Sequence, residues 1–144
     1  MMLSIIKSYF SFLVAKFGYV EKVFTDDEVY YQNGEFAILI AVDREGPMLL
    51  YVDIKSRLRY HLGFFLINKR GGELRYPSSD DFVKQCENGL KRDAQMLEDK
   101  GFDILNGNMK WKRDYGWNPL RIPDHVIDFL KCDTCSKPMQ GSKV

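Results

Sequence analysis

Thiols and imidazoles are the side chains of this sequence that could bind a metal or take part in redox chemistry. Cys132 and Cys135 form a CxxC pair, which in redox proteins usually stands at a helix N-terminus, where the dipole lowers the thiol pKa. Here the pair follows a predicted helix and leads into the last residues of the chain. A structural zinc site needs four ligands, and only His125, His61 and Cys86 are left to complete one. Cys132, Cys135 and His125 are therefore the metal candidates, although two incidental cysteines explain the pattern more simply.

Paired carboxylates and the remaining histidine could serve general acid–base catalysis, but each has an ordinary structural explanation. The acidic pairs at 26–27 and 80–81 lie in a predicted turn and at the predicted start of a helix, where the dipole favours acids. His61 lies in an apolar run, and a histidine in such a strand is more often structural than catalytic. The sequence contains no GxSxG, P-loop, dinucleotide-binding or HExxH motif. We therefore predict no catalytic residue and no cofactor.

Residues 109–117 mix basic and aromatic side chains and hold both tryptophans of the chain. The candidate contact residues in this stretch are Trp111, Lys112, Arg113, Tyr115 and Trp117. Basic residues between aromatic ones can hold the phosphates of a nucleic acid while its bases stack. Trp, Tyr and Arg are also common hot spots of protein interfaces. Alternatively, the two tryptophans fill the core below the edge of a sheet while the basic side chains stay in water.

Charge gives only local hints about partners. The net charge is +1, so no overall field draws the chain to nucleic acid or to an anionic membrane. Six basic residues flank the segment 58–67, namely Lys55, Arg57, Arg59, Lys69, Arg70 and Arg75. Such a cluster fits either an acidic partner or a solvated rim. We therefore expect no membrane partner, and we do not expect a nucleic acid as the main partner.

Length and composition are those of an ordinary globular domain. The 144 residues are 45% apolar and 28% charged, which suits one domain with a real core. We predict a single α+β domain over residues 1–131 and a flexible C-terminal tail over residues 132–144. The apolar N-terminal stretch is too short to span a bilayer and lacks the basic start and cleavage site of a signal peptide. The three cysteines, an odd number, fit a reducing compartment, so we expect a cytoplasmic protein.

Residues 19–67 organise the predicted fold, because they have the pattern of consecutive antiparallel strands. Seven consecutive apolar residues predict a central strand over 35–43 that is buried on both faces. Asn33 and Gly34 before this strand favour a tight hairpin turn. Further strands are predicted over 19–24, 28–32 and 48–54, whereas residues 58–67 fit either a fifth strand or a short helix. The short links between strands favour an antiparallel meander.

Helices are predicted before and after these strands. An apolar stripe over residues 3–17 predicts an N-terminal helix that ends at Gly18. Ser78 or Ser79 is expected to cap a long second helix, and a short third helix is expected over residues 123–130. We therefore predict an α+β fold: an antiparallel four- to five-stranded meander sheet with the N-terminal helix and the long second helix packed on one face. The Trp-rich stretch, a protein partner or a second copy of the chain would then cover the other face.

This order of helix, strand meander and long helix resembles that of small bacterial α+β proteins of the toxin-immunity type. The resemblance rests on hydrophobic spacing in residues 10–13, 17–18, 36–40, 49–54 and 82–105. It implies a cytoplasmic protein that blocks a toxin through surface complementarity, and it carries over no binding residue. The neutral charge of the chain counts against a nuclease as the target.

The leading prediction is a non-enzymatic protein that binds another protein or itself, with an immunity-like inhibitor of a toxin as its specific form. The first alternative is a small-ligand-binding protein or a small enzyme that uses a cleft between sheet and helices. In that case His61, Tyr51 and a carboxylate should converge in a deep cavity. The second alternative is a weak nucleic-acid binder that uses residues 109–117.

Overall fold

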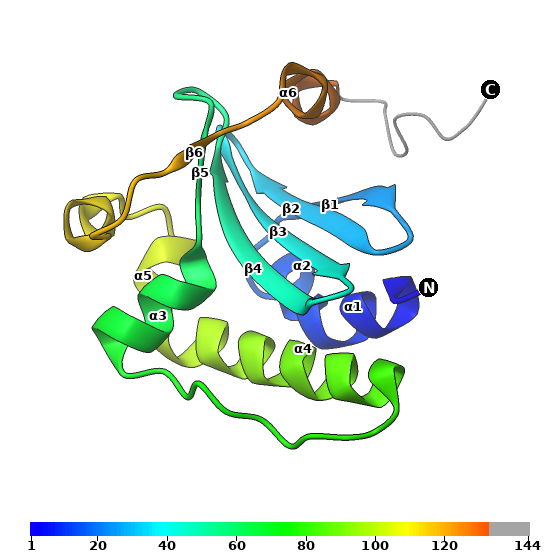
Figure 1. Cartoon of the computed structure of the whole chain (residues 1–144). Coiled ribbons are helices and arrows are strands. Elements are labelled where there is room, and N and C mark those ends of the chain that lie inside the picture. The colour runs from blue at the N-terminus through cyan, green and yellow to red at the C-terminus, as the bar shows by residue number, and fades with distance from the viewer. Residues whose placement is uncertain (133–144) are drawn as a thin grey trace.

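A computed structural model describes residues 1–132 of the chain as an antiparallel sheet with helices on both faces (Figure 1). The sheet has six strands, and their order in space is their order in the sequence. The strands are β1 (Val20–Thr25), β2 (Glu28–Asn33), β3 (Phe36–Asp43), β4 (Gly46–Asp53), β5 (Leu58–Tyr60) and β6 (Leu120–Arg121). The predicted α+β meander is confirmed, with β6 as an additional strand.

Helices on one face of the sheet include the two that the sequence predicted. The helical segments are α1 (Leu3–Phe10), α2 (Phe12–Ala15), α3 (Leu62–Arg70), α4 (Phe82–Lys100), α5 (Phe102–Leu105), the 3-10 helix η1 (Lys110–Asp114) and α6 (Asp124–Lys131). Helices α1, α3 and α4 pack on one face, whereas α6 lies over the other (Figure 1). The sheet thus separates two cores, which we call the α4-side core and the α6-side core.

Strand β3 belongs to both cores, as its apolar composition predicted. Ile38 and Ile40 are buried in the α4-side core, and Ala37 and Leu39 are buried in the α6-side core. This division follows from the alternation of side chains along a strand. The predicted hairpin turn before β3 is also present, and Gly34 adopts the positive φ of +66° that such a turn requires.

The ambiguous segment 58–67 is a strand at its start and a helix afterwards. Strand β5 ends at Tyr60, and His61 then caps α3 by accepting a hydrogen bond at Nδ1 from the backbone N–H of Phe64, over 3.1 Å. Gly71 ends α3 in the left-handed conformation, with a φ of +70°. Hydrophobic periodicity could not separate the two possibilities, because the apolar residues lie on both sides of a cap that the pattern does not reveal.

Two predicted helices differ from the structure in their details. The cap of α4 is Asp81 rather than Ser78 or Ser79, because its carboxylate accepts hydrogen bonds from the N–H groups of Val83 and Lys84. The N-terminal helix is interrupted after Phe10, and the chain continues as the short helix α2.

Helix α6 covers the face of the sheet that the two main helices leave open. Apolar spacing predicts Ile122, Val126 and either Phe129 or Leu130 on the inward face of this helix, and all four are buried there. The expectation that the Trp-rich stretch or a partner supplies this cover is corrected, because Trp111 packs in the α4-side core instead. The predicted C-terminal tail lies outside the described residues, apart from Cys132.

Lys22 fixes the end of α6 to the first strand. Its side chain is buried, and Nζ donates hydrogen bonds to the backbone carbonyl oxygens of Leu130 (2.8 Å) and Cys132 (3.2 Å). The carbonyls of the last turn of a helix lack partners within the helix, and a lysine is well suited to bind them. A residue of β1 therefore holds a helix that follows it by more than 100 residues.

Candidate functional site

Trp111, the first of the predicted contact residues, is a core residue. Its side chain is buried, and its ring centroid lies 4.9 Å from that of Tyr51, 5.3 Å from Tyr60 and 5.2 Å from Phe65. Ring pairs at such distances stabilise a core beyond the area that they bury. Trp111 therefore attaches η1 to the sheet and to α3, and it offers no surface to a partner.

Lys112 is occupied by an ion pair. Its Nζ lies 2.6 Å from Oδ2 of Asp53 and above the rings of Tyr51 and Tyr60. Burial alone would raise the pKa of the Asp53 carboxyl, but hydrogen bonds from Lys112 and Ser56 and the charge of Lys112 hold it below its usual value. Lys112 thus stabilises the position of η1 and is not an exposed cation.

Tyr115 connects η1 with the start of α3. It is buried, and its hydroxyl oxygen accepts a hydrogen bond of 2.6 Å from the backbone N–H of His61. Its ring lies 5.0 Å from that of Tyr60. Of the predicted contact residues, only Arg113 and Trp117 have exposed side chains.

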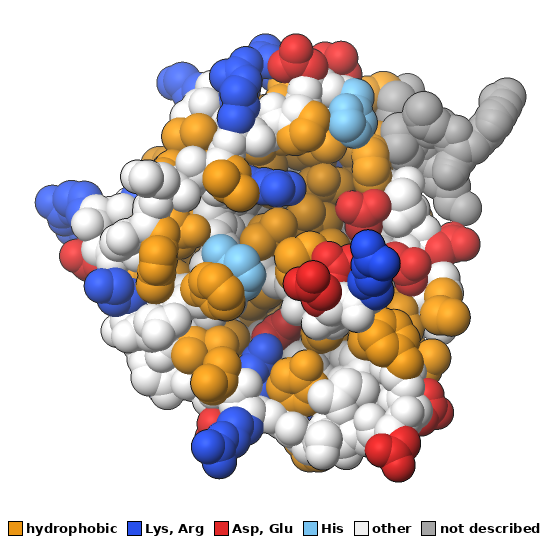
Figure 2. Space-filling view, viewed as in Figure 1, with side chains coloured by type: hydrophobic (Ala, Val, Ile, Leu, Met, Phe, Trp, Pro, Cys, Tyr) orange, Lys and Arg blue, Asp and Glu red, His pale blue; other side chains and the backbone are white. Residues whose placement is uncertain are grey.

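Trp117 borders an apolar groove at the end of the sheet where β4, β5 and β6 meet. We call this the apolar groove; its volume is about 320 Å³, and it is lined by Met48, Leu50, Arg59, His61, Phe64, Tyr115, Trp117, Asn118 and Leu120. Figure 2 shows hydrophobic side chains gathered around a hollow on this side of the molecule. Its residues from β4, Met48 and Leu50, pack in the α6-side core, so the groove lies on the face of the sheet opposite α4.

The wall of the apolar groove carries three large apolar side chains in contact with water. Phe64 is 50% exposed, Trp117 is 41% exposed and Leu120 is 59% exposed. The ring of Phe64 stacks on His61 at 3.8 Å and lies 6.4 Å from the ring of Trp117, which in turn lies 5.2 Å from the buried ring of Tyr115. Contacts with His61 and with the buried ring of Tyr115 therefore hold the exposed rings of Phe64 and Trp117 in place.

His61 lines this groove in a structural role. Its Nδ1 accepts the capping hydrogen bond from Phe64, and burial lowers its pKa below the usual value. A neutral imidazole that accepts at Nδ1 carries its proton on Nε2. Tyr51, which the enzyme alternative placed beside His61 in a cleft, is buried in the α4-side core, and none of the described residues that line the groove carries a carboxylate. The predicted convergence of His61, Tyr51 and a carboxylate does not occur.

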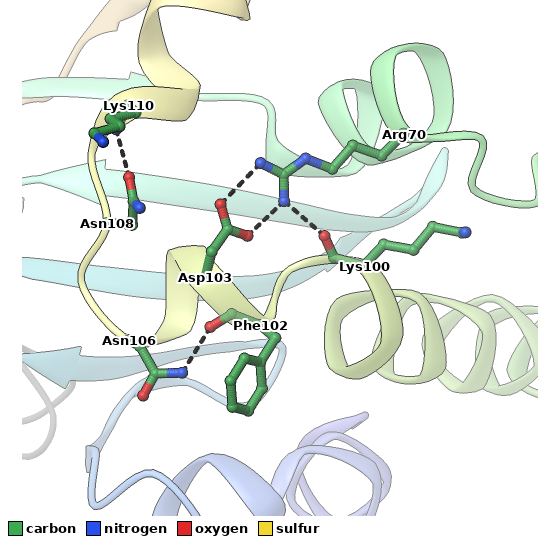
Figure 3. A network of polar contacts seen from close by, with 7 residues as sticks. All are labelled: Arg70, Lys100, Phe102, Asp103, Asn106, Asn108 and Lys110. Carbon is green, nitrogen blue, oxygen red and sulfur yellow. Dashed lines mark hydrogen bonds and ion pairs between the residues drawn. The ribbon is translucent and has the colours of Figure 1, made fainter.

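Two residues of the basic cluster that the sequence singled out, Arg57 and Arg70, form internal ion pairs. Arg57 pairs with Asp124 at 3.1 Å. Arg70 makes a two-pronged ion pair with Asp103, at 2.5 and 2.9 Å, and also donates to the backbone carbonyl of Lys100 (Figure 3). This network joins the end of α3 to the junction between α4 and α5. A shallow pocket of about 510 Å³ beside this network is also lined by Asp114 and by two cations, Lys69 and Arg113, that form no ion pair with any of residues 1–132.

The metal candidates are not brought together within the described residues. His125 stacks on Phe24, with ring centroids 6.1 Å apart, and Cys135 lies outside the described part of the chain. Across residues 1–132 no group of three or more His, Cys, Asp or Glu side chains is arranged to hold a metal ion. The groove residues Phe64, Asn118 and Leu120 were not predicted, because they become neighbours only through the short strand β6.

The chain matches no protein-family model, no curated protein and no solved structure. No helix within residues 1–132 combines the length and the apolar composition that crossing a bilayer requires.

Proposed function

We propose that this chain is a non-enzymatic protein-binding protein whose partner occupies the apolar groove. The observation that carries the proposal is the wall of Phe64, Trp117 and Leu120, three large apolar side chains that are at least 41% exposed and lie together. Large apolar side chains that gather on a surface are typical of interaction sites. A rigid aromatic anchor beside a pocket is also the usual centre of a protein interface.

The chemistry of the groove supports binding better than catalysis. Its histidine caps α3, and the part of the chain that the structure describes places no carboxylate in the lining to act with this histidine as an acid or a base. A small apolar ligand is the second candidate, because a volume of about 320 Å³ lies at the lower end of small-molecule sites. Nucleic acid is supported less well, since Trp111 and Tyr115 are buried and Lys112 is paired with Asp53.

Peptide display tests the binding proposal without a known partner. A random peptide library is selected on the wild-type protein, and the selected peptides are then titrated against Leu120→Ala and Trp117→Ala. We expect each variant to bind about tenfold more weakly, because the truncation of an interface anchor costs more than about 1 kcal/mol. Leu74→Ala is the matched control, since Leu74 is 64% exposed but lies outside the groove. Peptides that bind all of these proteins equally well would refute the proposal.

The specific form of the proposal is inhibition of a toxin in the cytoplasm. It is supported by the resemblance to toxin-immunity proteins, which implies a cytoplasmic inhibitor. The test is titration calorimetry of the wild-type chain with a toxin-like protein encoded beside its gene. We expect a complex that Trp117→Ala weakens. A toxin-like neighbour that does not bind would remove the immunity role and leave the groove as a binding site for another protein.

A further inference from the structure

Arg59 is a cation in the lining of the apolar groove. Its neighbours in β5, Leu58 and Tyr60, pack in the α4-side core, so the alternation of the strand directs Arg59 to the opposite face. Its partner across the sheet in β4 is Val52, which is buried in the α6-side core, and its partner in β6 is Leu120. Arg59 is itself only partly exposed and lines the apolar groove.

The groove does not supply Arg59 with a counter-ion. No ion pair and no side-chain hydrogen bond is formed by Arg59 with the residues that the structure describes, whereas Arg57, Arg70 and Arg92 each pair with an aspartate. Among residues 1–132, those that line the groove include this one guanidinium and no acid. Lys69 adds a second positive charge at the rim, since its Nζ lies 5.8 Å from the ring of Trp117. A partly desolvated guanidinium without a carboxylate is unfavourable, and a carboxylate from a ligand would relieve this cost.

We infer that the partner inserts an acidic side chain, flanked by bulky apolar side chains, into the apolar groove. This inference rests on the proposed function and adds the chemistry of the bound segment. The carboxylate of an Asp or Glu would pair with Arg59, and the planar guanidinium suits such a pair because it can donate two parallel hydrogen bonds. The apolar side chains beside the acid would contact Phe64, Trp117 and Leu120. The charge of Arg59 and the apolar wall of the groove would thus both favour the same kind of partner segment.

The composition of selected peptides tests this inference. The random library is selected in parallel on the wild-type protein, on Arg59→Gln and on Arg121→Gln. Arg121 is the matched control, because it follows Leu120 in β6 but does not line the groove. We expect Asp and Glu to be enriched beside Trp, Phe or Leu on the wild-type protein and on Arg121→Gln. Arg59→Gln should keep the preference for apolar residues and lose the preference for acids.

A measurement on the peptide side does not depend on the folding of any variant. One selected peptide is synthesised twice, with its acid and with the corresponding amide, and both forms are titrated against the wild-type protein by calorimetry. We expect the amide to bind about tenfold more weakly. On Arg59→Gln the two forms should bind about equally, and Arg59→Lys should restore part of the difference because it keeps the charge but not the planar fork.

The outcomes separate this inference from the proposed function. Peptides that depend on Trp117 but show no preference for acids would overturn the role of Arg59 and leave the groove as a protein-binding site. Equal binding of the acid and the amide to the wild-type protein would have the same meaning. If no selected peptide depends on Trp117, the proposed function fails and this inference fails with it.

Discussion

Lys112 and Asp53 form an ion pair that lies between aromatic rings rather than at the surface. The pair links η1 to the last residue of β4 and also faces Tyr51 and Tyr60. A basic residue in an aromatic stretch can indicate a binding site or a buried ion pair, and the sequence does not distinguish the two. At the scale of single residues, the outcome depends on whether a carboxylate lies within reach in the folded protein.

Substitution of Lys112 tests whether its ion pair with Asp53 stabilises the fold. In Lys112→Met the carboxylate of Asp53 stays largely buried without its cation, so we expect a loss of unfolding free energy of ~2–4 kcal/mol near neutral pH. Because the pKa of Asp53 is lowered in the folded protein, its stabilising effect is present above its usual pKa and is lost as the pH falls through the folded value. Urea titrations across the acid range should therefore show a weaker loss of stability in Lys112→Met than in the wild type.

Lys110→Met is the control for this prediction, because Lys110 also belongs to η1 but its side chain is exposed. Its stability should stay within about 0.5 kcal/mol of the wild type. Equal effects of the two substitutions would show that the ion pair does not stabilise η1.

Asp93 should give the opposite dependence on pH. It is buried in α4, and burial raises its pKa to about 6 although Arg92 Nε lies 2.8 Å from its carboxylate. The folded protein therefore binds this proton more tightly than the unfolded chain does. The resulting stabilisation is complete below the usual carboxyl pKa, and it is lost as the pH rises through about 6.

The substitution Asp93→Asn tests this prediction. We compare the unfolding free energy of the variant with that of the wild type at each pH. This difference should shift in favour of the variant between a pH of about 4 and a pH of about 8, by at most ~3 kcal/mol. Asp99→Asn changes an exposed carboxylate of the same helix and should show no such trend. A constant difference between Asp93→Asn and the wild type across this pH range would contradict the prediction.

At the scale of elements, α6 covers the face of the sheet opposite α4, and its contacts with the sheet are mainly aromatic. Phe129 is buried, and its ring lies 5.0 Å from that of Phe24 and 5.9 Å from that of Tyr30. Phe129→Ala should lower the unfolding free energy by about 3–5 kcal/mol, because it leaves a cavity between helix and sheet. Urea denaturation measures this loss.

Phe82→Ala is the matched control, since Phe82 is about half exposed at the start of α4. It should cost less than about 1 kcal/mol. A similarly small effect of Phe129→Ala would mean that α6 is not an integral part of the core.

Most of the elements could be predicted from the sequence, because local pattern and tertiary structure agree in them. The two-sided burial of β3 and the inward face of α6 both followed from apolar spacing. Strand β6 could not be predicted, since its two residues pair only because the fold brings them beside β5. The switch from strand to helix at His61 also depends on a side-chain cap that periodicity does not report.

The candidate site was less predictable than the fold. Residues 109–117 stand out in the sequence, but Trp111 and Tyr115 are buried and only one of the two tryptophans borders the groove. Phe64 and Leu120 carry no motif, and they lie on α3 and β6, which are far apart in the sequence. Local sequence patterns indicate which side chains are to be buried or paired, whereas the groove forms only when the tertiary structure brings distant residues together.

At the scale of the whole molecule, the distribution of charge predicts weak contact with nucleic acid. The net charge is +1, and several of the basic residues form internal ion pairs. We therefore expect no tight binding to a single-stranded oligonucleotide in fluorescence anisotropy, even at low salt. Binding that weakens steeply as salt is added, and that Arg113→Gln reduces, would contradict this prediction.

The hydrogen bonds of Lys22 have a consequence for the folding of the chain during its synthesis. They join a residue near the start of the chain to the end of α6, across 108 positions of sequence. A ribosome releases β1 to β5 long before it releases α6, so the growing chain must hold an apolar sheet face without its cover. Ala37, Leu39 and Leu50 would stay exposed during that interval. Until translation passes α6, this face would be open to chaperones and to aggregation.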